Sequence, residues 1–343
     1  MKVLLLLNGP EGCQTGIEDG FSNLKSKQVI DDLDWFYLGD YAKKKSMKLA
    51  LKESLVIAER MQSTMIIIFH IGKLEVENDY MLDLRHLKSK PILVYDEGDM
   101  YGTWAKPITQ SMRTVIKAVD VVSIRGMGKF YSQLYKLNKN IVYTPHHADI
   151  ARFDRPPSIY EERDNKVVLI GNKVMPRLLS SVRRLPGAKG REKFIKCMGE
   201  AFSNEFVLYG NDWNEMKGNQ GPVDFYEQLD VYKNSWITVA YEHYPDIPYY
   251  FSNRLPIALL AGSIYVCHEH KGYEDIFKGC DFIFFFKTNS EAIDLVNYIH
   301  SLSKKDLIDR SKRAREFSLK NFHPHVVWQN FYNNVLQFTR EQS

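Results

Sequence analysis

Short hydrophobic runs alternate with longer amphipathic stretches along the first half of the chain. The runs are Val3–Leu7, Trp35–Leu38, Met65–His70, Pro91–Tyr95, Val119–Ile124 and Ile141–Thr144. The clearest helical pattern between them spans Lys48 to Met61. Short apolar runs separated by helices are typical of parallel strands covered on both faces. We therefore predict a doubly wound, Rossmann-like α/β domain over residues 1–155.

The pattern breaks near residues 150–165, where a Pro pair at Pro156-Pro157 and several charged residues indicate a linker. The alternation then resumes with strand-sized runs at Val167–Ile170, Phe206–Tyr209, Ile237–Tyr241, Ile264–Cys267 and Phe282–Phe286. Helical stretches are expected at Arg191–Phe202, Phe225–Lys233, Arg254–Ala261 and Glu291–Leu302. A second Rossmann-like domain is predicted over residues 156–322. The remaining residues, 323–343, should form a helix that packs back on the first domain, because one of its faces is apolar.

Two open α/β domains in tandem are expected to bind ligands at the carboxyl ends of their strands. If the domains face each other, the strand-end loops of both would line one cleft. The loops expected there are Asn8–Gly16, His70–Lys73, Asp96–Asp99, Gly171–Arg177, Gly210–Trp213, Glu242–Arg254 and His268–Gly272.

Composition narrows the functional classes. The 343 residues are 44% hydrophobic and 26% charged, which is typical of a globular protein. A net charge of +4 does not indicate a general nucleic-acid binder. The apolar run after Met1 is too short for a signal peptide, and no stretch reaches the roughly 18 apolar residues of a spanning helix. With four scattered cysteines, the chain is expected to be a cytoplasmic protein without a transmembrane segment.

The most informative segment runs from Tyr249 to Ser263. Ser252 and Asn253 suit a helix N-cap, and Gly262 suits a helix end. Arg254 would then lie at a helix N-terminus, where backbone amides and a guanidinium could bind a diphosphate. From the pattern alone, Arg254 could equally lie on a solvated helix face.

This segment resembles the helix-opening motif of GT-B fold glycosyltransferases, particularly the compact spore-maturation-type enzymes. Pro145–Phe153 is similar to the Pro-His-x-x-Asp-x-x-x-Phe segment that closes the first domain in that superfamily, and Tyr273–Cys280 resembles one of its later loops. The resemblance implies two Rossmann-like domains, with the acceptor bound by the first and a nucleotide sugar by the second. It implies a hexosyltransferase-like enzyme that needs no cofactor and uses a UDP-sugar as its donor substrate.

The resemblance also implies a set of donor-binding residues in the second domain. They are Gly171, Lys173, Arg177, Tyr209, Gly210, Ser252, Asn253, Arg254 and Glu269. Many relatives carry a ribose-binding Glu three or four residues after the Arg position, but this chain has Ile257 and Ala258 there. The ribose would then be held elsewhere, with Glu269 or Glu274 as candidates, or the donor differs from the usual one.

Three residues are candidates for catalysis in the first domain. Asp96 follows a strand at a position that resembles, more distantly, the catalytic Asp of phage DNA β-glucosyltransferases. Asp99 and His70 are the second and third candidates for a base that takes the acceptor proton. The glycine-rich loop after the first strand, with Gly12, Thr15 and Gly16, is expected to approach the acceptor or the donor phosphate.

We expect metal independence, because no His, Cys or Asp set has metal-ligand spacing and basic groups can offset the leaving diphosphate. The acceptor is not identified by the sequence and could be a glycan, a lipid-linked molecule or a protein. DNA is a possible but not favoured acceptor, as in a phage-type DNA-base glucosyltransferase. A non-catalytic protein that binds nucleotides or sugar phosphates is the alternative from another class.

Overall fold

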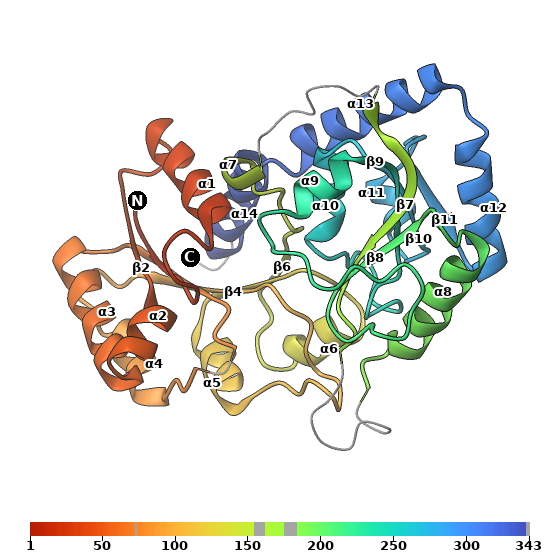
Figure 1. Ribbon diagram of the computed structural model, residues 1–343. Helices are drawn as coiled ribbons and strands as arrows, with labels where there is room; N and C mark the ends of the chain where they lie inside the picture. Colours follow the sequence, from red (N-terminus) through yellow and green to blue (C-terminus); the bar gives the residue numbers. More distant parts are fainter. Residues whose placement is uncertain (73, 154–161, 175–183, 341–343) are drawn as a thin grey trace. The chain divides into compact units, whose positions relative to one another are not determined.

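The computed structural model describes residues 1–72, 74–153, 162–174 and 184–340, which form two compact units. Unit 1 comprises Met1–Pro145 and Pro324–Ser343, and unit 2 comprises His146–His323. Each unit contains a parallel sheet flanked by helices, which confirms the predicted fold class of two Rossmann-like domains. Figure 1 shows both units in ribbon form.

The sheet of unit 1 has six parallel strands in the order β2-β1-β3-β4-β5-β6. They are β1 (Lys2–Leu6), β2 (Asp32–Phe36), β3 (Met65–Phe69), β4 (Ile92–Glu97), β5 (Val121–Ile124) and β6 (Ile141–Tyr143). The helices are α1 (Thr15–Ser26), α2 (Leu38–Lys44), α3 (Met47–Met61), α4 (Asn78–Arg85), α5 (Gln110–Ala118), α6 (Lys129–Tyr135) and α14 (Pro324–Arg340). In Figure 1, α1 and α14 lie on one side of this sheet and α2 to α5 on the other.

The C-terminal helix α14 completes the core of unit 1. Trp328 is fully buried, and its ring lies 5.6 Å from that of Phe21 and 5.5 Å from that of Phe69. A Cβ atom placed on Gly20 of α1 would lie only 2.2 Å from Trp328 Cδ1. Gly20 therefore allows α1 and α14 to approach closely enough for the indole to fill the core.

The sheet of unit 2 has five parallel strands in the order β11-β10-β9-β7-β8. They are β7 (Asp164–Ile170), β8 (Phe206–Tyr209), β9 (Ser235–Ala240), β10 (Ile264–His268) and β11 (Ile283–Phe286). The helices are α7 (Ile150–Phe153), α8 (Ala188–Ala201), α9 (Gln228–Lys233), α10 (Arg254–Leu260), α11 (Tyr273–Ile276), α12 (Asn289–His300) and α13 (Lys304–Asn321). Helix α10 contacts both α9 and α13, and α8 contacts α12, so the unit has two hydrophobic layers.

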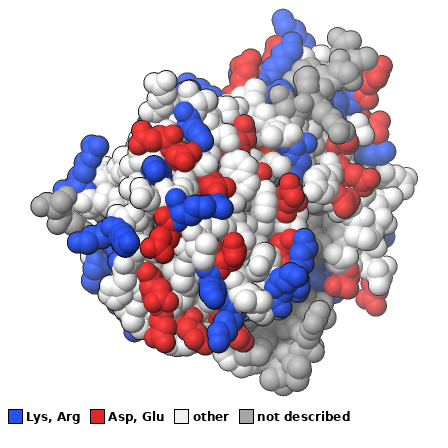
Figure 2. Space-filling model, turned by 90° about the vertical axis from the view of Figure 1, so that its left-hand side faces the viewer, with Lys and Arg blue, Asp and Glu red and all other residues white. Residues whose placement is uncertain are grey.

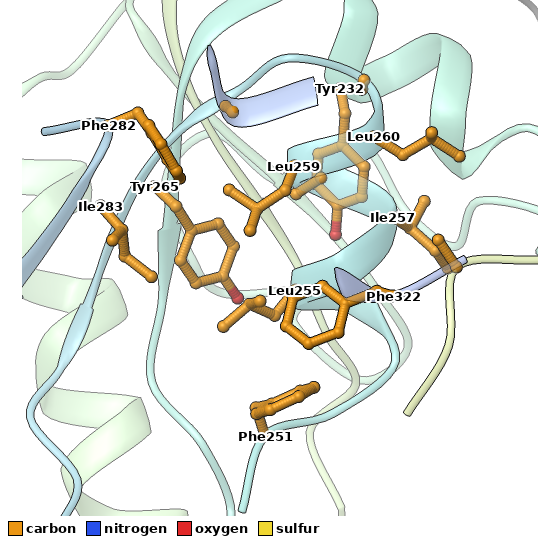
Figure 3. Close-up of a cluster of buried hydrophobic side chains, with 14 of the residues drawn as sticks. Tyr232, Phe251, Leu255, Ile257, Leu259, Leu260, Tyr265, Phe282, Ile283 and Phe322 are labelled. Atoms are coloured by element: carbon orange, nitrogen blue, oxygen red, sulfur yellow. The ribbon is translucent and has the colours of Figure 1, made fainter. Parts of the chain in front are cut away.

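Helix α10 is buried from Leu255 to Leu260. Figure 3 shows Leu255, Ile257, Leu259 and Leu260 packed among the aromatic rings of Phe251, Tyr232, Tyr265 and Phe322. Ile257 is 1% exposed and Ala258 is fully buried. The two positions where many relatives carry a ribose-binding Glu are therefore core positions in this chain.

The first unit ends earlier than the sequence predicts. The Pro145–Phe153 segment was assigned to the first domain, but Ala148, Ile150 and Phe153 are buried in the hydrophobic core of unit 2. The backbone N–H of Ala148 donates to the carbonyl of Phe322 at 2.8 Å, which ties this segment to the end of α13. The predicted boundary at 155/156 itself lies outside the described residues.

The surface gives no sign of a membrane-spanning element. Within the described ranges, no helix is both long and apolar enough to cross a bilayer. On the face that Figure 2 shows, Lys and Arg side chains are interspersed with Asp and Glu side chains. That face therefore carries no broad region of a single charge.

Candidate active site

In unit 1, His70 and Glu97 form a hydrogen-bonded pair at the carboxyl ends of β3 and β4. Phe69 is paired with Asp96 in the register of these strands, which places the next residues, His70 and Glu97, side by side. His70 Nδ1 lies 2.5 Å from Glu97 Oε1. The Tyr95 hydroxyl donates to the other carboxylate oxygen, and the backbone N–H of Asp99 donates to Oε1 at 2.9 Å. The fully buried Glu97 is therefore satisfied from three sides.

The environment favours the protonated form of His70. Burial alone would lower its pKa, but the hydrogen bond and negative charge of Glu97 outweigh burial, so the pKa of His70 is raised. Burial, with the charge of Glu97, raises the pKa of the Tyr95 phenol well above its usual value. Because Nδ1 is held by Glu97, Nε2 is the ring nitrogen that can exchange a proton with a ligand.

Asp96 lies on the other side of the strand from Glu97 and is held by an arginine. Arg125 donates to both of its carboxylate oxygens, at 2.8 and 2.6 Å, and both side chains are buried. Asp99 is about half exposed, and its carboxylate lies 2.5 Å from Lys106 Nζ. Each of the two predicted base carboxylates therefore faces a cation. The bidentate pair occupies both carboxylate oxygens of Asp96 with hydrogen bonds from Arg125.

The glycine-rich loop after β1 leads directly into α1. Gly12 has a φ of +77°, and a Cβ atom there would meet nothing within 4 Å. Thr15 is the first residue of α1, and Gly16 is buried in its first turn. This loop lies at the same edge of the sheet as His70, because β1 and β3 are parallel neighbours.

In unit 2, Glu242 connects the end of β9 to the start of α10. It is 3% exposed and accepts a hydrogen bond from Ser252 Oγ at 2.8 Å. Arg254 Nη2 lies 3.9 Å from Glu242 Oε2. Burial would raise the pKa of Glu242, but the charges of Arg254 and Arg191 outweigh burial and lower it. Glu242 is therefore an ionised, buried carboxylate between two arginines.

Arg191 brings the second positive charge to this position from the first turn of α8. Its Nε donates to the carbonyl of Tyr241 at 2.6 Å, and its Nη1 lies 2.7 Å from His243 Nε2. Burial, followed by the charge of Arg254, lowers the pKa of Arg191 to about 10, so it stays protonated at neutral pH. Burial and the two arginines lower the pKa of His243 to about 2, so this imidazole is neutral and can accept a hydrogen bond from Arg191.

We call Arg191, Glu242 and Arg254 the arginine cluster. Its three side chains line one small cavity between the ends of β7, β9 and α10. The buried Arg191 and the partly exposed Arg254 face one carboxylate, so the cluster carries an excess positive charge. The backbone N–H of Gly187, at the N-terminal end of α8, donates to the carbonyl of His243 at 2.8 Å, which places the positive end of a 14-residue helix beside the cluster.

Several predicted donor residues lie next to the arginine cluster. A Cβ atom on Gly171 would lie 3.2 Å from Arg191 Nη1, and one on Gly210 would lie 2.2 Å from the carbonyl of Gly171. Ser252 contacts Glu242 directly, and Asn253 is the N-cap residue of α10 without a capping side-chain hydrogen bond. Gly171 and Gly210 therefore permit a close approach of two loops at the edge of the sheet.

Other predicted donor residues lie apart from the cluster or have other contacts. Lys173 Nζ lies 3.6 Å from Glu192 Oε1, so its charge is balanced by an acid of α8. Tyr209 lines a different cavity, with Lys166 and Ser203. Glu269 is partly exposed and lies 3.3 Å from Lys287 Nζ. Arg177 lies outside the described residues.

Sequence reasoning did not select Glu97, Arg191, Glu242 or His243 as site residues. Glu97 and Glu242 each end a strand or follow it directly, in loops that the sequence did assign to the site. Arg191 gave no such signal, because it lies inside α8 and reaches the strand end only through tertiary packing. Among the described residues, no group of His, Cys, Asp and Glu side chains could hold a metal ion.

Comparison with known proteins is informative at the level of the fold. The family model described as glycosyl transferase-like matches residues 178–333. An α-glucosyltransferase, solved with UDP-glucose and DNA containing an abasic site, is similar with a TM-score of 0.61 and 12% identity, over 97% of this chain and 98% of that one. HepE of Anabaena, solved with UDP and glucose, has a TM-score of 0.54 and 12% identity, over 98% of this chain and 100% of that one.

TarM of S. aureus, solved with UDP among its ligands, has a TM-score of 0.54 and 10% identity. The match covers 83% of this chain but only 59% of TarM, so this chain spans little more than half of that protein. No curated protein matches the sequence. The chain therefore shares the fold of these glycosyltransferases, with two parallel α/β units, and its residues 178–333 match a glycosyl transferase-like family model.

Proposed function

We propose that this protein transfers a hexosyl group from a nucleoside diphosphate sugar, preferably a UDP-sugar, to a hydroxyl group of an acceptor. The excess positive charge of the arginine cluster carries this proposal. As the bond between the anomeric carbon and the β-phosphate oxygen breaks, negative charge develops on the leaving diphosphate. Arg191, Arg254 and the N-terminal end of α8 would offset that charge.

A uridine nucleotide is supported by the ligands of the similar structures. HepE and the α-glucosyltransferase were solved with UDP or UDP-glucose. The ribose must be recognised without the acidic side chain of other family members, since Ile257 and Ala258 lie in the core. Glu269 and Glu274 remain our candidates for that contact.

We further propose that catalysis requires neither a metal ion nor a cofactor. In metal-dependent transferases, a divalent cation balances the diphosphate charge. Here the arginine cluster can do so, and the carboxylates of Asp96 and Asp99 already face Arg125 and Lys106.

In unit 1, His70 is our candidate for the group that takes the acceptor proton. Glu97 fixes its tautomer and ring orientation through Nδ1, as the carboxylate does in other His–carboxylate pairs. The acceptor oxygen would lose its proton to Nε2 while it forms the bond to the anomeric carbon. Asp99, which is partly exposed, is the second candidate.

Binding of UDP to the full-length chain tests the donor assignment. Arg254→Ala and Arg191→Ala should each weaken UDP binding in calorimetric titration by about 1.5–3 kcal/mol, the scale of a hydrogen bond to a charged group. Arg313→Ala is a matched control, because Arg313 is a half-exposed arginine of unit 2 that pairs with Asp281. UDP affinity that stays unchanged in both cluster variants would refute the donor site. Release of UDP from UDP-sugars would separate an enzyme from a protein that only binds nucleotides.

A further inference from the structure

A second cavity lies in unit 1, beside the loop that follows β4. It has a volume of about 510 Å³ and lies between this loop, α5 and the end of α6. Trp104, Arg113, Gln133 and Lys136 supply its larger polar and aromatic side chains. We call it the Trp104 pocket. Its volume is in the range of cavities that hold one small ligand, such as one or two sugar rings.

Trp104 is unusual for its exposure. Its side chain is 58% exposed, whereas Trp213, Trp236 and Trp328 are almost completely buried. An indole ring is a flat apolar surface with one polar N–H group. A hexose ring has a similar amphipathic character, because its C–H groups gather on one face and its hydroxyl groups surround the edge. Trp104 therefore provides a platform of the kind on which a sugar ring can stack.

The pocket also has a definite charge. Arg113 and Lys136 line it, and among the described residues no Asp or Glu does so. Neither cation forms an ion pair with any other residue that the structure describes. A guanidinium presents a planar pair of donors that suits a phosphate or carboxylate group. The lining therefore favours a ligand that combines a sugar ring with a negative charge.

A glycine fixes the contact between the loop and α6 at the edge of the Trp104 pocket. Gly102 has a φ of +82°, and a Cβ atom there would lie 1.9 Å from Gln133 Oε1. Gln133 Nε2 donates to the carbonyl of Gly102 at 3.2 Å. Only a residue without a side chain allows this contact, which fixes an amide with hydrogen-bonding capacity at the edge of the pocket.

The same loop joins the pocket to the candidate base. Tyr101, which precedes Gly102, has its ring centre 6.4 Å from that of His70. Lys106 Nζ lies 4.2 Å from the centre of the Tyr101 ring and contacts Asp99. The loop between Glu97 and Pro107 therefore carries residues that contact His70 and residues that line the Trp104 pocket.

We propose that the Trp104 pocket binds the acceptor, and that the acceptor is a saccharide carrying a phosphate or carboxylate group. The assignment of this ligand as an acceptor rests on the proposed glycosyltransferase function. Single-stranded nucleic acid also uses aromatic stacking and cations, but its sites track several phosphates along a basic groove. One platform with two cations in a compact pocket fits a charged sugar better.

Titration of the full chain, saturated with UDP, tests the proposal. The ligands are glucose 6-phosphate, a disaccharide containing glucuronic acid, neutral maltose and a short oligothymidylate. At least one of the two anionic sugars should bind about tenfold more tightly than maltose, because Arg113 and Lys136 contact its charge. Trp104→Ala should weaken that binding by about tenfold, and Trp104→Phe should restore most of it. Arg113→Ala should remove the preference for the anionic sugar.

The outcomes separate this proposal from the proposed function. UDP affinity should be the same in the wild type and in all three variants, since the donor residues are in unit 2. If anionic sugars bind no better than maltose, or bind Trp104→Ala as well as the wild type, the acceptor assignment is overturned. Preference for oligothymidylate, with affinity that falls steeply with salt, overturns it in favour of nucleic acid. Failure of the wild type to bind UDP would instead count against the donor site.

Discussion

Arg125 holds Asp96 through two hydrogen bonds, from Nη1 to Oδ1 and from Nη2 to Oδ2, at the carboxyl end of β4. The Arg125 side chain is 5% exposed and the Asp96 side chain 3%. The Arg125 guanidinium also lies 5.8 Å from the ring centre of Trp328 on α14. This pair therefore links the candidate site to the core of unit 1.

Asp96→Asn should reduce the free energy of unfolding, measured by urea denaturation, by about 3–5 kcal/mol. The reason is that removal of one partner leaves the Arg125 charge buried without compensation. Asp99→Asn is the control, and it should cost no more than about 1 kcal/mol because its ion pair is partly exposed. Equal stability of Asp96→Asn and the wild type would contradict a structural role for this pair and restore Asp96 as a candidate base.

If His70 is the catalytic base, the turnover number should depend on pH. It must be neutral at Nε2 to take a proton, and its pKa is raised by Glu97. The turnover number should therefore rise with pH above the usual histidine value of about 6.5. His70→Gln should lower turnover by about 10²–10⁴ and remove this rise, while UDP affinity is preserved. A turnover profile of His70→Gln with the same shape as the wild type would exclude His70 as the base.

The His70–Glu97 pair should also make the stability of the protein depend on pH. Because the folded pKa of His70 is raised, the protonated pair stabilises the native state fully below the unfolded histidine pKa of about 6.5. That contribution is lost as pH rises through the folded pKa. The difference in melting temperature between wild type and His70→Gln should therefore be larger at pH 5.5 than at pH 9. A difference in melting temperature that does not change with pH would show that protonation of His70 does not stabilise the folded protein.

Gly20→Ala should destabilise unit 1, because the added methyl group would overlap the indole of Trp328. Overpacking of this kind costs about 1–3 kcal/mol. Gly98→Ala is a suitable comparison, since a Cβ atom at Gly98 would meet nothing within 4 Å. Similar free energies of unfolding for the two variants would mean that α14 can move away from α1 without a cost.

Metal independence can be tested with EDTA. Transfer or donor hydrolysis should continue at its normal rate after dialysis against the chelator, because the arginine cluster supplies the positive charge. Loss of activity that Mn²⁺ or Mg²⁺ restores would contradict this and would require ligands beyond those assigned here.

The strands could be predicted from the sequence because each is a short apolar run between polar residues. Every run selected in this way overlaps a strand of one of the two sheets. Helix α13 was not predicted, since its buried positions are mostly small residues such as Ser311, Ala314 and Ser318, which give a weak apolar pattern. The boundary predicted after residue 155 lies later than the start of unit 2 at His146, because a Pro pair indicates a linker but does not show on which side a preceding buried segment packs.

The candidate site was harder to predict than the fold. His70 and Asp96 were selected because they end strands, but the choice between Asp96 and Glu97 depends on which face of the strand each side chain occupies. Arg125, the partner of Asp96, is far from it in the sequence, and no sequence pattern indicates that the two side chains pair. Arg254 was selected from its helix-start pattern, whereas Arg191 reaches the same cavity from within another helix.

The return of α14 to unit 1 has a consequence for the order in which the protein folds during synthesis. Unit 2 is one uninterrupted stretch, His146–His323, so all of its strands leave the ribosome before α14 does. Unit 1 begins first but lacks Trp328 and Phe331 until the last helix has been made. We therefore expect unit 2 to reach its native state before unit 1. Until α14 has been made, the face of α1 that packs against it stays exposed.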